Sequence, residues 1–96
     1  MKEILALALC FSLASCREPA KKAVPHLVEQ LASSEVKVRN QAALDLAPYG
    51  SEAADAVPAL IKRLQDPNTG VRSSAAYALR KIGTPEANAA LDAYKK

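Results

Sequence analysis

The sequence predicts an all-α protein built as a short α-solenoid of stacked helix pairs, and three observations support this. Alanine and leucine supply most of the apolar half of the 96 residues, whereas aromatic residues make up only 4%. From residue 23 onward the chain aligns with itself after a shift of 33 residues, and a fixed period of this length is typical of helical repeats. Glycine is scarce and β-branched residues are scattered, which argues against an all-β fold.

An export signal is predicted ahead of the repeats. Residues 1–3 are a short polar start, and residues 4–13 form an almost unbroken apolar run that is followed by the small residues 14–15. This order is typical of a secretory signal peptide, and the run is shorter than the roughly 20 residues that span a bilayer. We therefore expect residues 1–15 to be a signal helix. The alternatives are a buried N-terminal helix and a signal without lipid attachment.

The end of this run, residues 13–16 (L-A-S-C), resembles the bacterial lipobox, in which an aliphatic residue and two small ones precede a cysteine. The resemblance implies that Cys16 is joined to a diacylglycerol and becomes the first residue of the mature chain. Residues 16–22 are then the lipidated cysteine and a polar tether. By the same resemblance, Arg17 favours anchoring in the outer membrane, facing the periplasm, if the cell is Gram-negative.

Each repeat is predicted to be a pair of helices. In the first helix of each pair, apolar residues recur at positions i, i+3, i+4 and i+7, which places them on one face. The second helices have a stripe that contains alanines, so neighbouring helices can approach closely. The four stripes are Val24, Leu27, Val28 and Leu31; Val38, Ala42, Leu46 and Tyr49; Val57, Leu60, Ile61 and Leu64; and Val71, Ala75, Leu79 and Ile82.

Prolines and capping residues predict where the helices begin. Pro25 and Pro58 are expected in the opening turns of the first helices, where their missing N–H is not required. Ser34 and Asn68 are predicted to be the N-caps of the second helices.

Two equivalent glycines, Gly50 and Gly83, are predicted to end the second helices with positive φ. Repeat 1 then covers residues 23–55 and repeat 2 covers residues 56–86. The tail, residues 87–96, has lost much of the apolar stripe and is predicted to be a partial capping helix.

The repeated motifs resemble HEAT repeats, in the short variant also found in phycobilin lyases. The resemblance covers most of the predicted mature chain and implies a helical solenoid. It is specific for the fold and not for an activity. The matching motifs are A-V-P-x-L-[VI] at 23–28 and 56–61, V-R-x-x-A-A-x-x-L at 38–46 and 71–79, and D-P-N-T-G-V-R at 66–72.

The equivalent arginines Arg39 and Arg72 are candidates for ligand binding or for a structural role. The resemblance implies the structural role, in which the arginine bonds to the aspartate or the backbone of the repeat turns. Asp66 is available to Arg72, whereas Ser33 occupies the equivalent position in the first repeat.

The outer side of the second helices is the predicted partner-binding face. Positions off the buried stripe recur there at helical spacing, and two of them hold a leucine and a tyrosine, which is favoured at interfaces. The alternative is a solvated face with two partly covered large residues. The predicted binding residues are Lys37, Gln41, Leu44, Ser74, Tyr77 and Lys81.

Composition and motifs exclude several function classes. Thirteen basic against ten acidic residues, a net charge of +3, is too balanced for a dedicated nucleic-acid binder. One His and two Cys exclude a Cys/His zinc site within one chain. No catalytic constellation or phosphate loop is present, so we expect no enzyme activity, cofactor or metal.

These observations predict a lipid-anchored module or scaffold that binds an unidentified protein. The alternatives are a HEAT-type enzyme or chromophore factor similar to phycobilin lyases, and a fragment of a longer array without its own partner. Two repeats are short for a solenoid, because about three usually bury a continuous core. The capping helix, self-association or a partner would supply the buried area that two repeats alone lack.

Overall fold

The computed structural model describes residues 19–95, and every regular element in that range is helical. The predicted signal peptide and Cys16 lie outside the described residues. The elements are α2 (Ala20–Gln30), α3 (Val36–Leu46), a 3₁₀ segment η1 (Ala47–Ala56), α4 (Val57–Arg63), α5 (Thr69–Ile82) and α6 (Pro85–Lys95).

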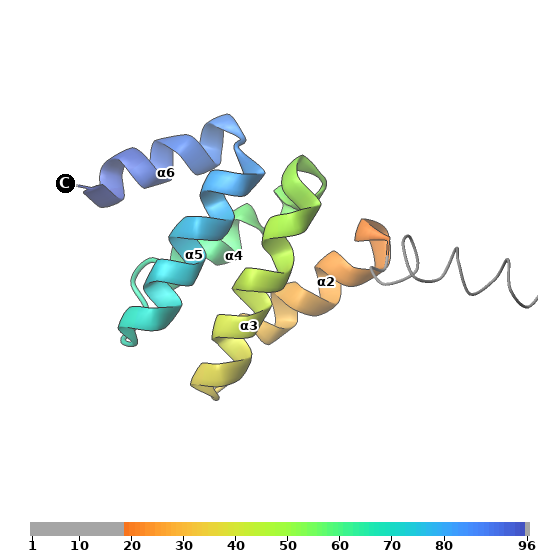
Figure 1. The fold of residues 1–96 in the computed structure, drawn as a ribbon, viewed down its shortest axis with the longest axis horizontal. Coiled ribbons are helices and arrows are strands. Elements are labelled where there is room, and N and C mark those ends of the chain that lie inside the picture. The colour runs from red at the N-terminus through yellow and green to blue at the C-terminus, as the bar shows by residue number, and fades with distance from the viewer. Residues whose placement is uncertain (1–18, 96) are drawn as a thin grey trace, which may run out of the picture.

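The helices form two stacked pairs followed by α6. Figure 1 shows α3 and α5 side by side at the front, with α2 and α4 behind them. Helix α5 packs against α3, η1, α4 and α6. The described residues therefore form the expected short all-α solenoid, with α2–α3 as one pair, α4–α5 as the next and α6 at the C-terminal end.

Most residues of the predicted stripes join one core cluster, and Val38 and Val71, near the starts of α3 and α5, lie outside it. Burying one leucine side chain fully, compared with leaving it in water, stabilises a fold by about 1.5–3 kcal/mol. Small residues fill the junction between α3 and α5, where Ala42, Ala43, Ala75 and Ala78 are fully buried and allow the helices to lie close together. The largest fully buried apolar side chains are Leu31, Leu46, Leu60, Leu79, Val57 and Val71.

The two predicted N-caps have different outcomes. Asn68 caps α5, because its side-chain oxygen accepts a hydrogen bond from the backbone N–H of Val71 at 3.1 Å. The prediction for Ser34 is wrong: α3 begins after Glu35, whose side chain makes no capping bond. The hydroxyl oxygen of Ser33 instead accepts the backbone N–H of Glu35 at 3.1 Å.

The two prolines also differ. Pro58 is in the opening turn of α4, as predicted. Pro25 lies inside α2, because that helix already begins at Ala20. The main-chain oxygen of Pro19 accepts from the N–H groups of Lys22 and Ala23, both at 3.0 Å, which starts the helix upstream. The interior Pro25 removes one N–H from the hydrogen-bond ladder of α2.

Both predicted glycines have positive φ. Gly83 ends α5 in the left-handed conformation (φ 67°, ψ 17°), and its N–H donates to the main-chain oxygen of Leu79 at 3.0 Å. Gly50 has φ 57° and ψ −137°, a combination that glycine favours, and it bends the chain inside η1.

Two helix boundaries differ from the sequence prediction. The second helix of repeat 1 was expected to continue to Tyr49, but α3 ends at Leu46 and the chain tightens into η1, where Pro48 supplies no N–H. The tail helix α6 starts at Pro85, ahead of the expected 87, because the hydroxyl oxygen of Thr84 accepts the N–H of Ala87 at 3.2 Å.

Candidate functional site

The junction between the two repeats contains one buried carboxylate that receives four hydrogen bonds. Arg39 donates from Nε to Oδ2 of Asp66 at 2.8 Å and from Nη2 to Oδ1 at 3.0 Å. Arg63 donates to Oδ2 at 2.9 Å, and the N–H of Asn68 donates to Oδ1 at 2.9 Å. These bonds join α3, α4 and the turn before α5.

Arg39 and Arg72 also each donate a hydrogen bond to the turn that precedes the second helix of their own repeat. Nη1 of Arg39 donates to the main-chain oxygen of Ser33 at 3.0 Å, and Nη1 of Arg72 donates to the main-chain oxygen of Asp66 at 2.6 Å. The main-chain oxygen of Asp66 thus accepts a hydrogen bond from Arg72 of the same repeat, whereas the carboxylate of Asp66 binds Arg39 of the preceding repeat. The sequence prediction missed this cross-repeat pair, because residue spacing does not show which arginine the carboxylate faces.

The environment of Asp66 lowers its pKa. Burial alone raises the pKa of this carboxyl, because it disfavours the charged form. The hydrogen bonds from Arg39 and from the Asn68 N–H, together with the charges of Arg39 and Arg63, outweigh burial and hold the pKa below its usual range. The buried carboxylate is therefore ionised and fully paired, which is the pattern of a structural ion pair.

A hollow lies on the face formed by α3 and α5, at their C-terminal ends. Three of the predicted binding residues meet there: Leu44, Tyr77 and Lys81. Leu44 is 37% exposed and Tyr77 is 41% exposed, and Nζ of Lys81 lies 5.6 Å from the centre of the Tyr77 ring. A cation at this distance is attracted to an aromatic face. The hollow has a volume of about 470 Å³, and Ala47, Pro48 and Gly50 complete its lining.

The other predicted binding residues lie outside this hollow. Lys37 and Gln41 are exposed on the earlier turns of α3, and the side-chain amide of Gln41 donates to Asp45 at 2.8 Å. The prediction for Ser74 is wrong, because its side chain is buried between α5 and α3 and its hydroxyl donates to the side-chain oxygen of Asn40. Helical spacing placed Ser74 near the exposed edge, but the closeness of α3 covers it.

The sequence prediction missed Pro48 and Ala47 as part of the hollow. Pro48 follows Leu44 by one helical turn, so the spacing contained a signal for it. The helical spacing does place position 48 on the predicted face, but Pro48 was not named among the binding residues.

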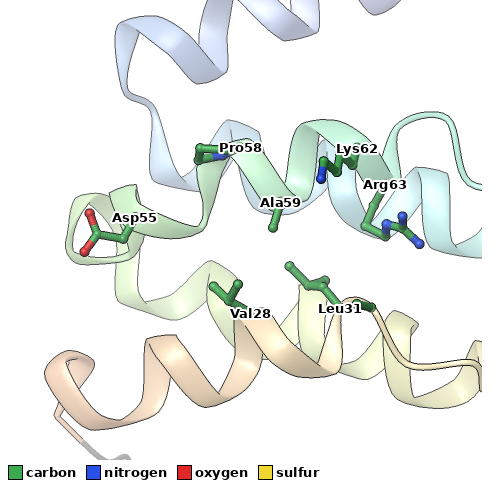
Figure 2. Close-up of a pocket in the computed structure, with 8 residues that line it drawn as sticks. Val28, Leu31, Asp55, Pro58, Ala59, Lys62 and Arg63 are labelled. Carbon is green, nitrogen blue, oxygen red and sulfur yellow. The ribbon is translucent and has the colours of Figure 1, made fainter.

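A second groove separates α2 and α4 (Figure 2). Val28 and Leu31 point from α2 toward α4, and Ala59 points back toward them. Because Ala59 is small, a space of about 350 Å³ remains between the two helices. Asp55 lies at one end and the basic side chains of Lys62 and Arg63 lie at the other.

Neither a membrane span nor a metal centre is found among residues 19–95. No helix in this range has the length and apolar character needed to cross a bilayer. The same range contains no group of three or more His, Cys, Asp or Glu residues placed to hold a metal ion.

The stacked helix pairs and the arginines bonded to the repeat turns define a small α-solenoid repeat protein. Residues 24–95 match the family model of HEAT repeats, and the chain belongs to the HEAT repeat family. Neither the curated proteins nor the solved structures give a significant match to this chain. HEAT repeats generally mediate protein–protein interaction.

Proposed function

We propose that the protein is a membrane-anchored interaction module that binds a partner protein through the face formed by α3 and α5. The observation that supports this most directly is the exposure of Leu44 and Tyr77, at 37% and 41%, around one hollow. Two large side chains left partly in water at the same place give a partner apolar area to bury, and tyrosine is enriched among the residues that dominate binding energy.

The surroundings of the hollow suit a protein partner. The hollow is lined by two helices and by η1, so its shape is largely fixed before binding, which reduces the entropy that binding must overcome. Nζ of Lys81 over the Tyr77 ring places positive charge beside the exposed Leu44 and Tyr77 side chains. A basic group in this position favours a partner segment that is apolar at its centre and acidic at its edge.

Membrane anchoring is the second part of the proposal, and the lipobox-like residues 13–16 support it. Each buried CH₂ of an attached lipid contributes about 0.8 kcal/mol, so two or more chains hold a protein stably at a bilayer. Confinement at a membrane raises the local concentration of both partners, and a weak contact at the hollow is then sufficient.

Affinity capture with matched variants tests the binding face. The double variant Leu44→Asp/Tyr77→Asp should lose the proteins that the wild type captures from envelope extracts, with recovery reduced at least about tenfold, as for central interface residues. Ala54→Asp, which adds a charge at an exposed site in η1, is the matched control and should retain capture. Circular dichroism confirms that all variants are folded. Capture that survives both substitutions would refute the assigned face.

Metabolic labelling with a fatty acid tests the anchor separately. Wild type and Cys10→Ala should both incorporate the label, because Cys10 lies in the segment expected to be removed. Cys16→Ala should incorporate none and should leave the membrane fraction. Equal labelling of the Cys16→Ala variant and the wild type would contradict lipid attachment at this residue.

A further inference from the structure

The hollow around Leu44 and Tyr77 lies at the same edge of the solenoid as the start of α2. Figure 1 shows α3 and α5 running in the same direction, with their ends on the side where α2 begins. The last turns of these two helices and the beginning of η1 line the hollow. The starts of α3 and α5 form the opposite edge, about 16 and 21 Å away along helices of 11 and 14 residues.

Helix α2 begins against the segment that forms one wall of the hollow. A depression of about 320 Å³ lies between the first turns of α2 and η1, and Ala20 and Glu52 are among the residues that line it. The same segment η1 lines the hollow through residues up to Gly50. Gly50 and Glu52 are two residues apart, so η1 leads from the hollow to the start of α2 within about 7 Å.

The proposed lipid anchor is close to this edge because few residues separate it from α2. Four residue steps lead from Cys16 to Ala20, and they span at most about 14 Å in any conformation. Packed segments such as α2 and η1 lie about 8–10 Å apart. The wall of the hollow is therefore within about 30 Å of the lipid-bearing cysteine. The opposite edge lies beyond it by the length of α3.

The hollow is small for a site that binds a protein from solution. Its lining includes two large apolar side chains, Leu44 and Tyr77, and one charged residue, Lys81. Two such side chains supply far less than the roughly 800 Å² per partner that a stable interface buries. A partner held in the same bilayer meets the hollow at a raised effective concentration, which a partner free in solution does not have.

We propose that the hollow binds the segment of a membrane-embedded protein that lies directly outside the bilayer, and that this edge of the solenoid faces the membrane. The inference rests on the proposed function, including its lipid anchor. The bound segment is apolar where it covers Leu44 and Tyr77 and acidic where it meets Lys81. The short tether selects a partner of this kind, because it holds the hollow at the height where such segments lie.

A second copy of the chain is a poorer occupant. Anchored in the same bilayer, it presents the same edge at the same height. Among the large apolar side chains exposed in residues 19–95, Val36 is at the opposite edge, and Leu44 and Tyr77 belong to the copy's own hollow. Tyr94 of α6 is left, and its pairing with a hollow would join unlike surfaces into rings or open chains. Helix α6 itself leads the described chain away from the hollow (Figure 1).

Energy transfer to the bilayer tests the orientation of the solenoid. The processed chain of the proposal has no free thiol, since Cys10 is removed and Cys16 carries lipid, so an introduced cysteine takes the only label. Ser51→Cys beyond the end of α3 and Ser34→Cys ahead of its start are matched exposed sites. On vesicles of phosphatidylethanolamine and phosphatidylglycerol with labelled head groups, transfer from Ser51→Cys should be at least about twofold higher, because the length of α3 separates the sites. Equal transfer, or the reverse order, would overturn the proposal.

Photo-crosslinking in intact envelope membranes tests the partner. A photoreactive amino acid in place of the exposed Gln41, one turn before Leu44, should form adducts with proteins that resist extraction by alkaline carbonate. A spacer of 20 Gly and Ser residues between Glu18 and Pro19 should lower the adduct yield about tenfold, because effective concentration falls as roughly the −3/2 power of tether length. The same spacer appended after Lys96 is the matched control and should leave the yield unchanged.

The results distinguish this proposal from the proposed function. Adducts may depend on Leu44 and Tyr77 and yet join soluble proteins, join two copies of the chain or survive the spacer; each of these results would overturn the membrane-surface partner and leave the binding face in place. Adducts that survive Leu44→Asp/Tyr77→Asp, or the absence of any adduct, would refute the binding face and this inference together.

Discussion

Arg39 on α3 and Asp66 before α5 form a bidentate ion pair across the repeat junction, although 27 residues separate them. The side chain of Asp66 is fully inaccessible to solvent and that of Arg39 is 11% exposed. Both charges have therefore left water, and each depends on the other for compensation. Removing one partner of such a pair costs more than the pair itself contributes, because an uncompensated charge stays buried.

Asp66→Asn should lower the free energy of unfolding by about 3 kcal/mol, since it leaves Arg39 buried without a counter-charge. Urea denaturation followed by circular dichroism measures the change. Asp55→Asn removes an exposed carboxylate and is the matched control; its stability should stay within about 0.5 kcal/mol of the wild type. Arg39→Gln combined with Asp66→Asn should cost much less than the sum of the single changes. Additive losses would show that the pair is not coupled.

Stability should also fall in acid because of Asp66. Its pKa is lower in the folded protein than in the unfolded chain, where it is about 3.9. The unfolded state then binds the proton more readily, so the stabilisation is complete above the unfolded pKa and is lost as the pH falls through the folded pKa. Denaturation midpoints from pH 7 to pH 2 should fall more steeply below pH 4 for wild type than for Asp66→Asn. Parallel curves would assign the acid sensitivity to other carboxyls.

The left-handed conformation of Gly83 predicts a loss on substitution by alanine. A Cβ there would meet only ordinary contacts, the nearest being the main-chain oxygen of Arg80 at 3.7 Å, so the cost comes from φ alone. Gly83→Ala should destabilise the fold by about 1–2 kcal/mol. Gly83→Asn should cost less, because asparagine tolerates this conformation. Equal thermal shifts for the two variants would show that steric contact, and not backbone conformation, sets the cost.

The repeat pattern was enough to predict the helix pairs and several of the residues that begin or end the helices. A 33-residue shift aligned residues that the structure buries in equivalent places, such as Leu46 and Leu79. The cap at Asn68 and the positive φ of both glycines follow from local chemistry, which a sequence displays directly. Each of these features depends on neighbours within a few residues along the chain.

The sequence prediction was wrong where contacts between helices determine which side chains are buried and which are paired. Ser74 has the spacing of an exposed residue, yet α3 packs so closely that Asn40 covers it. The carboxylate of Asp66 binds an arginine from the other repeat, and no local pattern distinguishes that partner from Arg72. The placement of Pro25 in an opening turn was wrong for a different reason: the main-chain oxygen of Pro19 accepts the first hydrogen bonds of the helix, so α2 begins at Ala20 and Pro25 is its sixth residue.

The central position of α5 has a consequence for how the protein unfolds. This helix touches α3, η1, α4 and α6, so it cannot detach without uncovering both pairs at once. The two repeats are therefore expected to melt together in one cooperative step, unlike long arrays that fray from their ends. The same dependence delays folding during synthesis, because the core stays open until α5 has emerged.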